Sequence, residues 1–335
     1  MRPRYLVLFF VFFQLSCHPQ QAKYNGVSFV ASREPIDSSH VAPVININSN
    51  AVALMPFGFI RDINSPEITH NSKRQWFGET EAGLRQYASV CKEKELQIMV
   101  KPQLWVWRGT YTGYIEMDTE EKWEQLENSY RSFILTYAKV AHEIDAELFC
   151  IGTELEKFVM ARPNYWRNLI KEIQSVYKGK LTYAANWDEY KRVSFWNQLD
   201  YIGIDAYFPI SDAKTPSLSE LELGWKPYKE EIKSIKAKFD KPVLFTEFGY
   251  RSIDYTAKAP WESKRVEGMV NLKGQENAMQ ALHNQFWKEE WFAGGFVWKW
   301  FHKHDRVGGL QNNQFTPQNK PVERLISKLY AEIGF

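Results

Sequence analysis

Compact apolar runs alternate with longer amphipathic stretches along most of the chain. The runs 147–153 and 242–248 are rich in Val, Ile, Leu and Phe, which is typical of strands covered on both faces in a parallel sheet. The stretch 120–143 has the apolar spacing of an amphipathic helix, and Thr119 with two following glutamates is a suitable start for it. This alternation predicts repeated βα units.

The pattern predicts eight strands and six helices, which together indicate an α/β fold. The predicted strands are 26–31, 51–59, 96–102, 147–153, 181–186, 201–207, 242–248 and 294–300, and the predicted helices are 79–95, 120–143, 165–177, 218–239, 275–290 and 321–333. Eight alternating strands favour a single-domain (β/α)8 TIM barrel. A doubly wound sheet would normally carry a Gly-rich phosphate turn after an early strand, and this chain has none.

The first 22 residues have the features of an export signal. Arg2 and Arg4 form a basic start, and the apolar run 5–13 that follows is too short to span a bilayer. Ser16 and Cys17 resemble the lipobox of bacterial lipoproteins, in which the cysteine is lipidated. We therefore expect residues 1–22 to be a lipoprotein-type signal peptide with a short tether. The protein would be anchored at the bacterial cell envelope through Cys17, with plain secretion as the alternative.

The composition adds two constraints on partners. The formal net charge of +2 provides no field that would attract nucleic acid. Aromatic residues make up 16% of the chain, including 13 Trp, and their flat faces could stack on sugar rings or fill an aromatic core. Cys91 and Cys150 have neither the CxxC spacing nor the His-rich neighbours of a metal site, so we expect no metal and no cofactor.

Two glutamates end the fourth and seventh predicted strands. Side chains alternate along a strand, so Glu154 shares its face with Cys150, and Glu247 shares its face with Val243 and Phe245. We expect both faces to line the barrel interior, which puts both carboxyl groups at the mouth where barrel enzymes carry their active sites. A retaining glycosidase needs one protonated and one ionised carboxyl about 5–5.5 Å apart. One such glutamate alone would favour a structural ion pair with a nearby Lys or Arg, whereas two at matching strand ends favour catalysis.

Three segments are distinctive: IGTEL at 151–155, LDYIGIDAYFP at 199–209 and FTEFGY at 245–250. Together they resemble glycoside hydrolase family 113, a clan A family made up mainly of β-1,4-mannanases. The resemblance covers nearly all of 24–333 and implies that Glu154 is the acid/base and Glu247 the nucleophile. Many clan A enzymes carry Asn before the acid/base, whereas this chain has Thr153. Another residue must therefore contact the sugar 2-hydroxyl.

Seven other residues at or near predicted strand ends are candidates for substrate binding. They are Tyr207, Trp298, Asn186, Lys101, Trp105, Arg61 and Asp205. A phenol such as Tyr207 can donate a hydrogen bond that keeps Glu247 ionised, and the resemblance makes Trp298 the floor beneath the sugar. Structural roles remain open, such as a barrel-lining aromatic for Tyr207 or a buried lysine for Lys101.

The sequence thus predicts a glycoside hydrolase barrel over 23–335 that cleaves a β-1,4-linked polysaccharide, most simply mannan or glucomannan, with retention. We expect a monomer that contacts the membrane only through its lipid. Another β-glycanase or β-glycosidase, acting on glucan or xylan, is the nearest alternative. A non-catalytic glycan-binding surface lipoprotein is an alternative of a different class, and a Schiff-base enzyme using Lys101 is a third.

Overall fold

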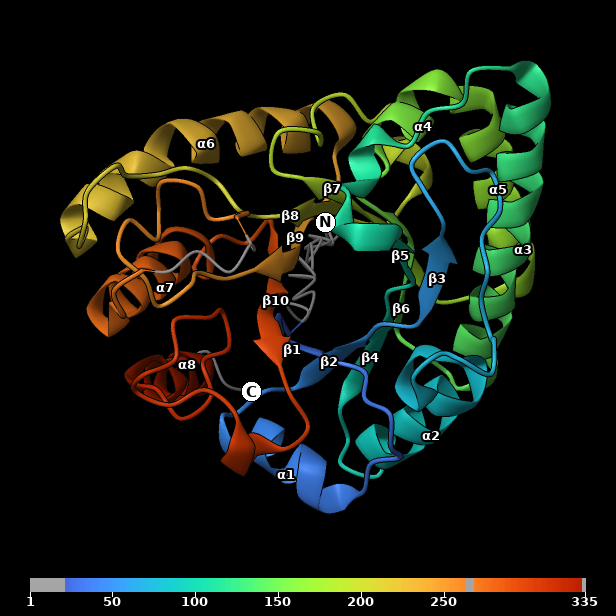
Figure 1. Ribbon diagram of the computed structural model, residues 1–335. Helices are drawn as coiled ribbons and strands as arrows, with labels where there is room; N and C mark the ends of the chain where they lie inside the picture. The colour runs from blue at the N-terminus through green and yellow to red at the C-terminus, as the bar shows by residue number, and fades with distance from the viewer. Residues whose placement is uncertain (1–21, 263–267, 333–335) are drawn as a thin grey trace, which may run out of the picture.

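The computed structural model describes residues 22–262 and 268–332, in which eight parallel strands close into a barrel (Figure 1). In order around the barrel they are β1 (Tyr24–Phe29), β10 (Phe292–Trp300), β9 (Val243–Phe248), β8 (Ile202–Asp205), β7 (Lys180–Asn186), β6 (Leu148–Thr153), β4 (Gln97–Val100) and β2 (Ala51–Leu54). Figure 1 looks along the barrel, with the strands at the centre and the helices around them. The predicted (β/α)8 fold is confirmed.

The described residues also form eight α-helices around the barrel. They are α1 (Ser38–Asn46), α2 (Glu81–Lys92), α3 (Glu120–Glu143), α4 (Glu156–Ala161), α5 (Pro163–Val176), α6 (Leu218–Phe239), α7 (Leu272–Phe286) and α8 (Pro321–Ala331). Short 3-10 helices occur at Phe77–Glu79, Trp107–Gly109, Thr112–Tyr114, Trp196–Gln198 and His304–Arg306. All six predicted helices are present, and each begins and ends within four residues of its predicted bounds.

Helices α1 and α4 were not predicted. Helix α1 contains Pro43, a residue that normally argues against a helix interior. Asp37 nevertheless caps its first turn, and its own residues Val41 and Val44 are buried. Helix α4 has six residues, which is too short for a helical period to be recognised.

The predicted strand 51–59 divides into a barrel strand and a strand outside the barrel, and the predicted strand 96–102 is followed by a second outer strand that was not predicted. After Pro56 the chain forms β3 (Phe57–Ile60), and after Pro102 it forms β5 (Gln103–Val106), and these two pair in a separate parallel sheet. Proline lacks the N–H that a central strand needs, so both barrel strands end just before these positions. The correction matters for function, because the small sheet extends beyond the barrel mouth.

Small and large side chains together fill the barrel interior. Ten residues form this inner cluster: Tyr24, Ala51, Ala53, Met99, Leu148, Cys150, Ala184, Tyr201, Leu244 and Phe296. A second, larger cluster lies between the strands and the helices. The closed interior leaves no room for a larger residue at Gly26, where an added Cβ would lie 2.3 Å from a ring carbon of Phe296.

The predicted facing of β9 is wrong. Leu244 belongs to the inner cluster, whereas Phe245 packs outward against Trp225 of α6 and Phe286 of α7. Ile204 of β8 pairs with Phe245, but the next residue of β8 pairs with Glu247, so the intervening residue of β9 forms a β-bulge. The bulge resets the alternation, and Glu247 reaches the barrel mouth although Phe245 faces outward.

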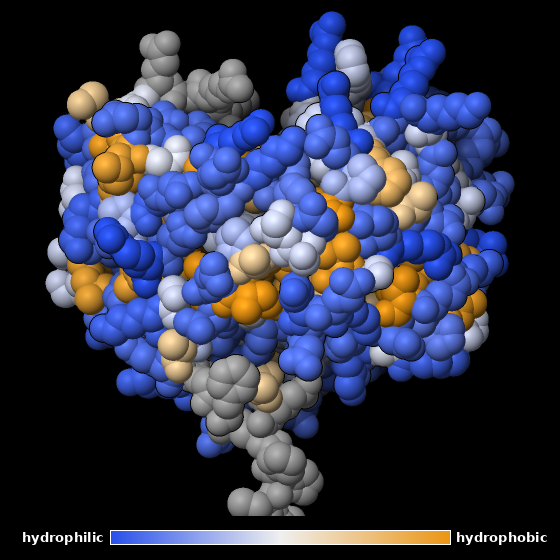
Figure 2. All heavy atoms as spheres, turned by 90° about the horizontal axis from the view of Figure 1, so that it is seen from below, coloured by the Kyte–Doolittle hydropathy of each residue, from blue (hydrophilic) through white to orange (hydrophobic). Residues whose placement is uncertain are grey.

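The helices of residues 22–262 and 268–332 do not meet the requirements for crossing a membrane. Within the described ranges, no helix combines the length and apolarity that crossing a bilayer requires. Figure 2 shows one side of the molecule, on which hydrophilic residues cover most of the surface and apolar residues form small separate groups.

We expect Gly26→Ala to lower the free energy of unfolding by about 1–3 kcal/mol, because the new methyl group overpacks the barrel interior against Phe296. Urea unfolding would measure this loss. Adding Phe296→Leu to the same chain should make the two losses less than additive. Strictly additive losses would show that the two residues are not in conflict.

Candidate active site

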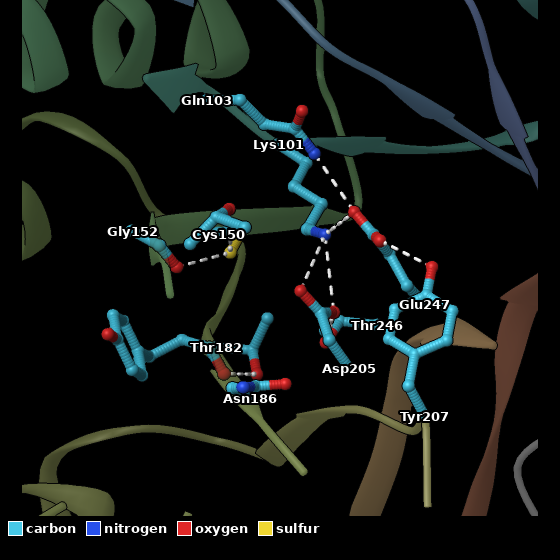
Figure 3. A network of polar contacts seen from close by, with 12 residues as sticks. Lys101, Gln103, Cys150, Gly152, Thr182, Asn186, Asp205, Tyr207, Thr246 and Glu247 are labelled. Carbon is cyan, nitrogen blue, oxygen red and sulfur yellow. Dashed lines mark hydrogen bonds and ion pairs between the residues drawn. The ribbon is translucent and has the colours of Figure 1, made fainter. Parts of the chain in front are cut away.

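Glu247 lies at the floor of the barrel mouth and accepts hydrogen bonds from three side chains (Figure 3). Its Oε1 accepts from Lys101 Nζ and, at 2.9 Å, from Gln103 Nε2. Its Oε2 accepts from the Tyr207 hydroxyl at 2.8 Å. Because all three partners donate, they stabilise a carboxylate that carries its charge.

Lys101 also lies 3.3 Å from both carboxyl oxygens of Asp205, and neither residue has any exposed surface. Burial and then the charge of Glu247 raise the pKa of Asp205 to about 7, although Lys101 and the hydrogen bond from Thr246 act in the opposite direction. Burial disfavours the charged form of Lys101, but attraction to Asp205 and Glu247 offsets this and holds its pKa above the usual value. Asp205 also accepts from Thr246 Oγ1 at 2.7 Å.

Glu154 follows the last residue of β6 in a left-handed backbone conformation, with φ of 51°. Its N–H donates to the carbonyl of Ala184 in β7 at 2.8 Å. No side chain among the described residues donates to its carboxyl group, unlike the three that donate to Glu247. Burial raises the pKa of Glu154 well above the usual value, and the nearby charges of Asp205 and Glu247 add to this effect.

The turn after Glu154 is held by a chain of buried hydrogen bonds. The N–H of Leu155 donates to the Tyr183 hydroxyl at 2.7 Å, and that hydroxyl donates to Glu189 Oε1 at 2.6 Å. The other oxygen of Glu189 accepts the N–H of Asn186 at 3.0 Å. Burial raises the pKa of Glu189 to about 8. One carboxyl group therefore ties the turn beside Glu154 to the end of β7.

A cavity of about 1130 Å³ opens above the two glutamates, and both line it. Aromatic side chains form much of its wall: Phe57, Phe59, Trp76, Trp105, Trp107, Tyr111, Trp298 and Phe301. Trp105 and Trp107 are 48% and 68% exposed, so their ring faces are open to a ligand. Since Phe57, Phe59 and Trp105 belong to β3 and β5, the small sheet outside the barrel builds one side of the cavity.

Comparison with known proteins identifies the family. Residues 33–320 match the model of glycoside hydrolase family 113. The chain belongs to glycoside hydrolase family 113. It is therefore a glycoside hydrolase, and the resemblance noted from its three sequence segments is confirmed.

Solved structures of this family share the fold of the hydrolase. The family 113 β-mannanase AaManA from Alicyclobacillus acidocaldarius, in complex with ManMIm, is 23% identical with a TM-score of 0.82, over 93% of this chain and 98% of that one. Another family 113 β-1,4-mannanase is 23% identical with a TM-score of 0.80, over 92% and 99%. A Faecalibacterium prausnitzii β-glucuronidase is 16% identical with a TM-score of 0.63, over 94% and 50%. No curated protein matches the chain.

The candidate substrate-binding residues of the hydrolase lie in three places. Arg61, Trp105 and Trp298 line the cavity. Lys101, Asp205 and Tyr207 lie against or below Glu247 and contact it or one another. Asn186 is half-buried at the end of β7, where its side-chain oxygen accepts the N–H of Trp187 at 2.9 Å. Their roles in substrate binding remain predictions.

Sequence reasoning missed Tyr183 and Glu189. Tyr183 lies inside β7 on the face that packs against Trp166 and Phe195, where an aromatic residue suggests only core packing. Glu189 lies in a turn after β7, where an acidic residue is normally solvated. Its 1% exposure is the property that marks it, and no sequence pattern reveals this burial.

In the part of the hydrolase that the structure describes, no group of three or more His, Cys, Asp or Glu side chains is arranged to hold a metal ion. Cys91 and Cys150 are buried free thiols. Cys17, the predicted lipidation site, lies outside the described residues.

We expect Lys101→Met to lower the free energy of unfolding by about 3–5 kcal/mol, because it leaves two buried carboxyl groups without their cation. Urea unfolding would measure it, and Asp205→Asn in the same chain should recover part of the loss. Lys122→Met, which removes an exposed pair with Asp118, is the matched control and should cost far less. Equal losses in the two single variants would contradict this account of the buried pair.

Proposed function

We propose that this hydrolase cleaves β-1,4-linked mannan or glucomannan with retention, using Glu154 as acid/base and Glu247 as nucleophile. The observation that carries the proposal is the contrast between two carboxyl groups on one cavity. Three donors stabilise Glu247 as an anion, whereas burial and neighbouring charges favour the protonated form of Glu154. A retaining glycosidase divides its two roles in this way.

The first step joins Glu247 to the sugar. Its carboxylate attacks the anomeric carbon while Glu154 gives its proton to the departing glycosidic oxygen, so the C–O bond breaks and a glycosyl ester forms. The hydrogen bond from Tyr207 to Oε2 orients the carboxyl group for this attack. Removing the negative charge of Glu247 lowers the pKa of Glu154, which prepares it to act next as a base.

The second step releases the sugar. Glu154, now ionised, takes a proton from a water molecule, whose oxygen attacks the anomeric carbon and displaces Glu247 as a carboxylate. Both glutamates return to their starting states, and the net reaction adds one water across the glycosidic bond. Gln103, which donates to Glu247 Oε1 and lines the cavity, is placed to contact the sugar beside the nucleophile.

The choice of mannan rests on the family and on its two solved relatives, which are described as β-mannanases. The open aromatic faces of Trp105 and Trp107 suit a polymer lying along the cavity. The proposal includes export, lipidation at Cys17 at the cell envelope, and action as a monomer.

The proposal is tested by product release from mannan, glucomannan, xylan, β-glucan and cellulose. We expect hydrolysis of mannan, with kcat reduced about 10²–10⁴-fold in Glu154→Gln and at least as strongly in Glu247→Gln. Glu156→Gln, two residues from Glu154 but paired with Arg192 on the outside, should keep its activity. Cleavage of xylan or β-glucan alone would overturn the assignment of mannan as the substrate. Binding without cleavage would indicate a glycan-binding lipoprotein.

Tyr183 positions the acid in this proposal, because its hydroxyl holds the N–H next to Glu154. We expect Tyr183→Phe to lower kcat/KM for mannan, whose alkoxide leaving group needs a proton. It should have a smaller effect on a dinitrophenyl β-mannoside, whose leaving group departs without one.

Tyr177→Phe is the control for this prediction, since it removes a similar buried hydrogen bond, to the carbonyl of Ala146, away from the cavity. It should affect the two substrates equally. If Tyr183→Phe also lowers both rates by the same factor, Tyr183 supports only the fold.

A further inference from the structure

Three cationic side chains line the cavity without an anionic partner. They are Arg61, Arg74 and Lys299. No ion pair or hydrogen bond joins any of them to another residue in the ranges 22–262 and 268–332. Among the other exposed arginines, Arg85 and Arg131 each contact a carboxylate, whereas Arg108 and Arg324 form no ion pair with the residues that the structure describes.

Lys299 is the most constrained of the three. It is half-buried, and its Nζ lies 5.1 Å from the ring centroid of Trp298 and 5.5 Å from that of Phe301. Burial lowers its pKa, and the charge of Glu247 opposes this shift. Contact with aromatic faces offsets only part of the free energy of burying an ammonium group. Lys101, by contrast, has two carboxyl groups within its reach.

The acidic residues of the cavity are already engaged. Glu79 accepts the backbone N–H of Trp76 at 3.0 Å, and burial raises its pKa. The carboxylate of Glu247 faces Lys101, and burial raises the pKa of Glu154. Among the described residues none of these groups forms an ion pair with Arg61, Arg74 or Lys299, so the three cations are available to an anionic ligand.

We propose that the glycan bound here carries carboxylate groups, as uronic acid residues do, and that Lys299, Arg61 and Arg74 bind them. The inference rests on the proposed function and adds to its β-1,4-linked mannan an acidic group that neutral mannan lacks. A neutral mannan offers hydroxyl groups, which can accept hydrogen bonds but cannot neutralise three cations. A carboxylate does both, and it matches the two-pronged donor geometry of a guanidinium group.

The aromatic wall fits the same ligand. Arg74 is two residues from Trp76, and Arg61 directly follows β3, which pairs with the strand that carries Trp105. Both arginines thus come from segments that also build the aromatic wall, in which Trp105 and Trp107 are exposed, so the cavity can hold a sugar ring and its carboxylate together. Lys299 lies next to Trp298, beside the two glutamates, where it can bind an acid group close to the bond that is cleaved.

The test compares two polymers that differ only in charge: β-1,4-mannan, and the same mannan oxidised at C6 to carboxylates. Affinity would be measured by electrophoresis through gels containing each polymer. We expect the protein to bind the oxidised mannan more tightly at about 50 mM salt and to lose much of that advantage at about 500 mM. Polygalacturonate, an α-linked polyanion, should bind more weakly than oxidised mannan.

Variants assign the preference to the three cations. Arg61→Gln with Arg74→Gln, and separately Lys299→Gln, should each reduce the ratio of the two affinities roughly three- to tenfold. Arg324→Gln, which removes an exposed arginine of α8 outside the cavity, should leave the ratio unchanged.

Three results would overturn the inference: equal affinity for both mannans, tighter binding of polygalacturonate, or variants that weaken both mannans by the same factor. Hydrolysis is scored separately, by release of reducing ends from either polymer. A protein that prefers oxidised mannan but cleaves neither polymer would refute the proposed function and leave the charge preference standing.

Discussion

The site depends on one buried ammonium group held between two carboxyl groups. Lys101 follows β4, Asp205 ends β8 and Glu247 lies in β9, so the contact exists only when the barrel is closed. A charge buried without a partner is strongly unfavourable, and this requirement fixes the side chains of all three residues. Glu247 thereby gains a set orientation and a stabilised negative charge before any substrate arrives.

Glu154 is positioned by the opposite means. The barrel provides its carboxyl group with burial and neighbouring negative charge but no donor, while the backbone around it is held firmly. Its own N–H is bound to Ala184, and the next N–H is bound to Tyr183. The structure thus fixes where this carboxyl group lies without stabilising its ionised form. The two glutamates on one cavity therefore have different surroundings: three donors contact Glu247, whereas burial raises the pKa of Glu154.

The sequence predicted the parts that depend on local pattern. Strand and helix periodicity located the barrel, and the strand ends located Glu154 and Glu247. The facing of β9 was wrong because a bulge depends on pairing with β8, which no single strand reveals. Pro56 and Pro102 lie inside apolar runs that look continuous, so the sheet of β3 and β5 was not foreseen. Tyr183 and Glu189 escaped notice because only tertiary packing buries them.

These differences separate two layers of the site. The carboxyl pair and Lys101 belong to the closed barrel, where altering one strand disturbs the rest. Most of the aromatic wall belongs to β3, β5 and the loops beyond them, which lie outside the barrel sheet, whereas Trp298 and Lys299 belong to β10 of the barrel. Apart from Gln103, which donates to Glu247, the side chains of the outer sheet can change without disturbing the carboxyl pair. In such a design the barrel fixes the position of the carboxyl groups, and the outer sheet and its loops can vary with the glycan that is bound.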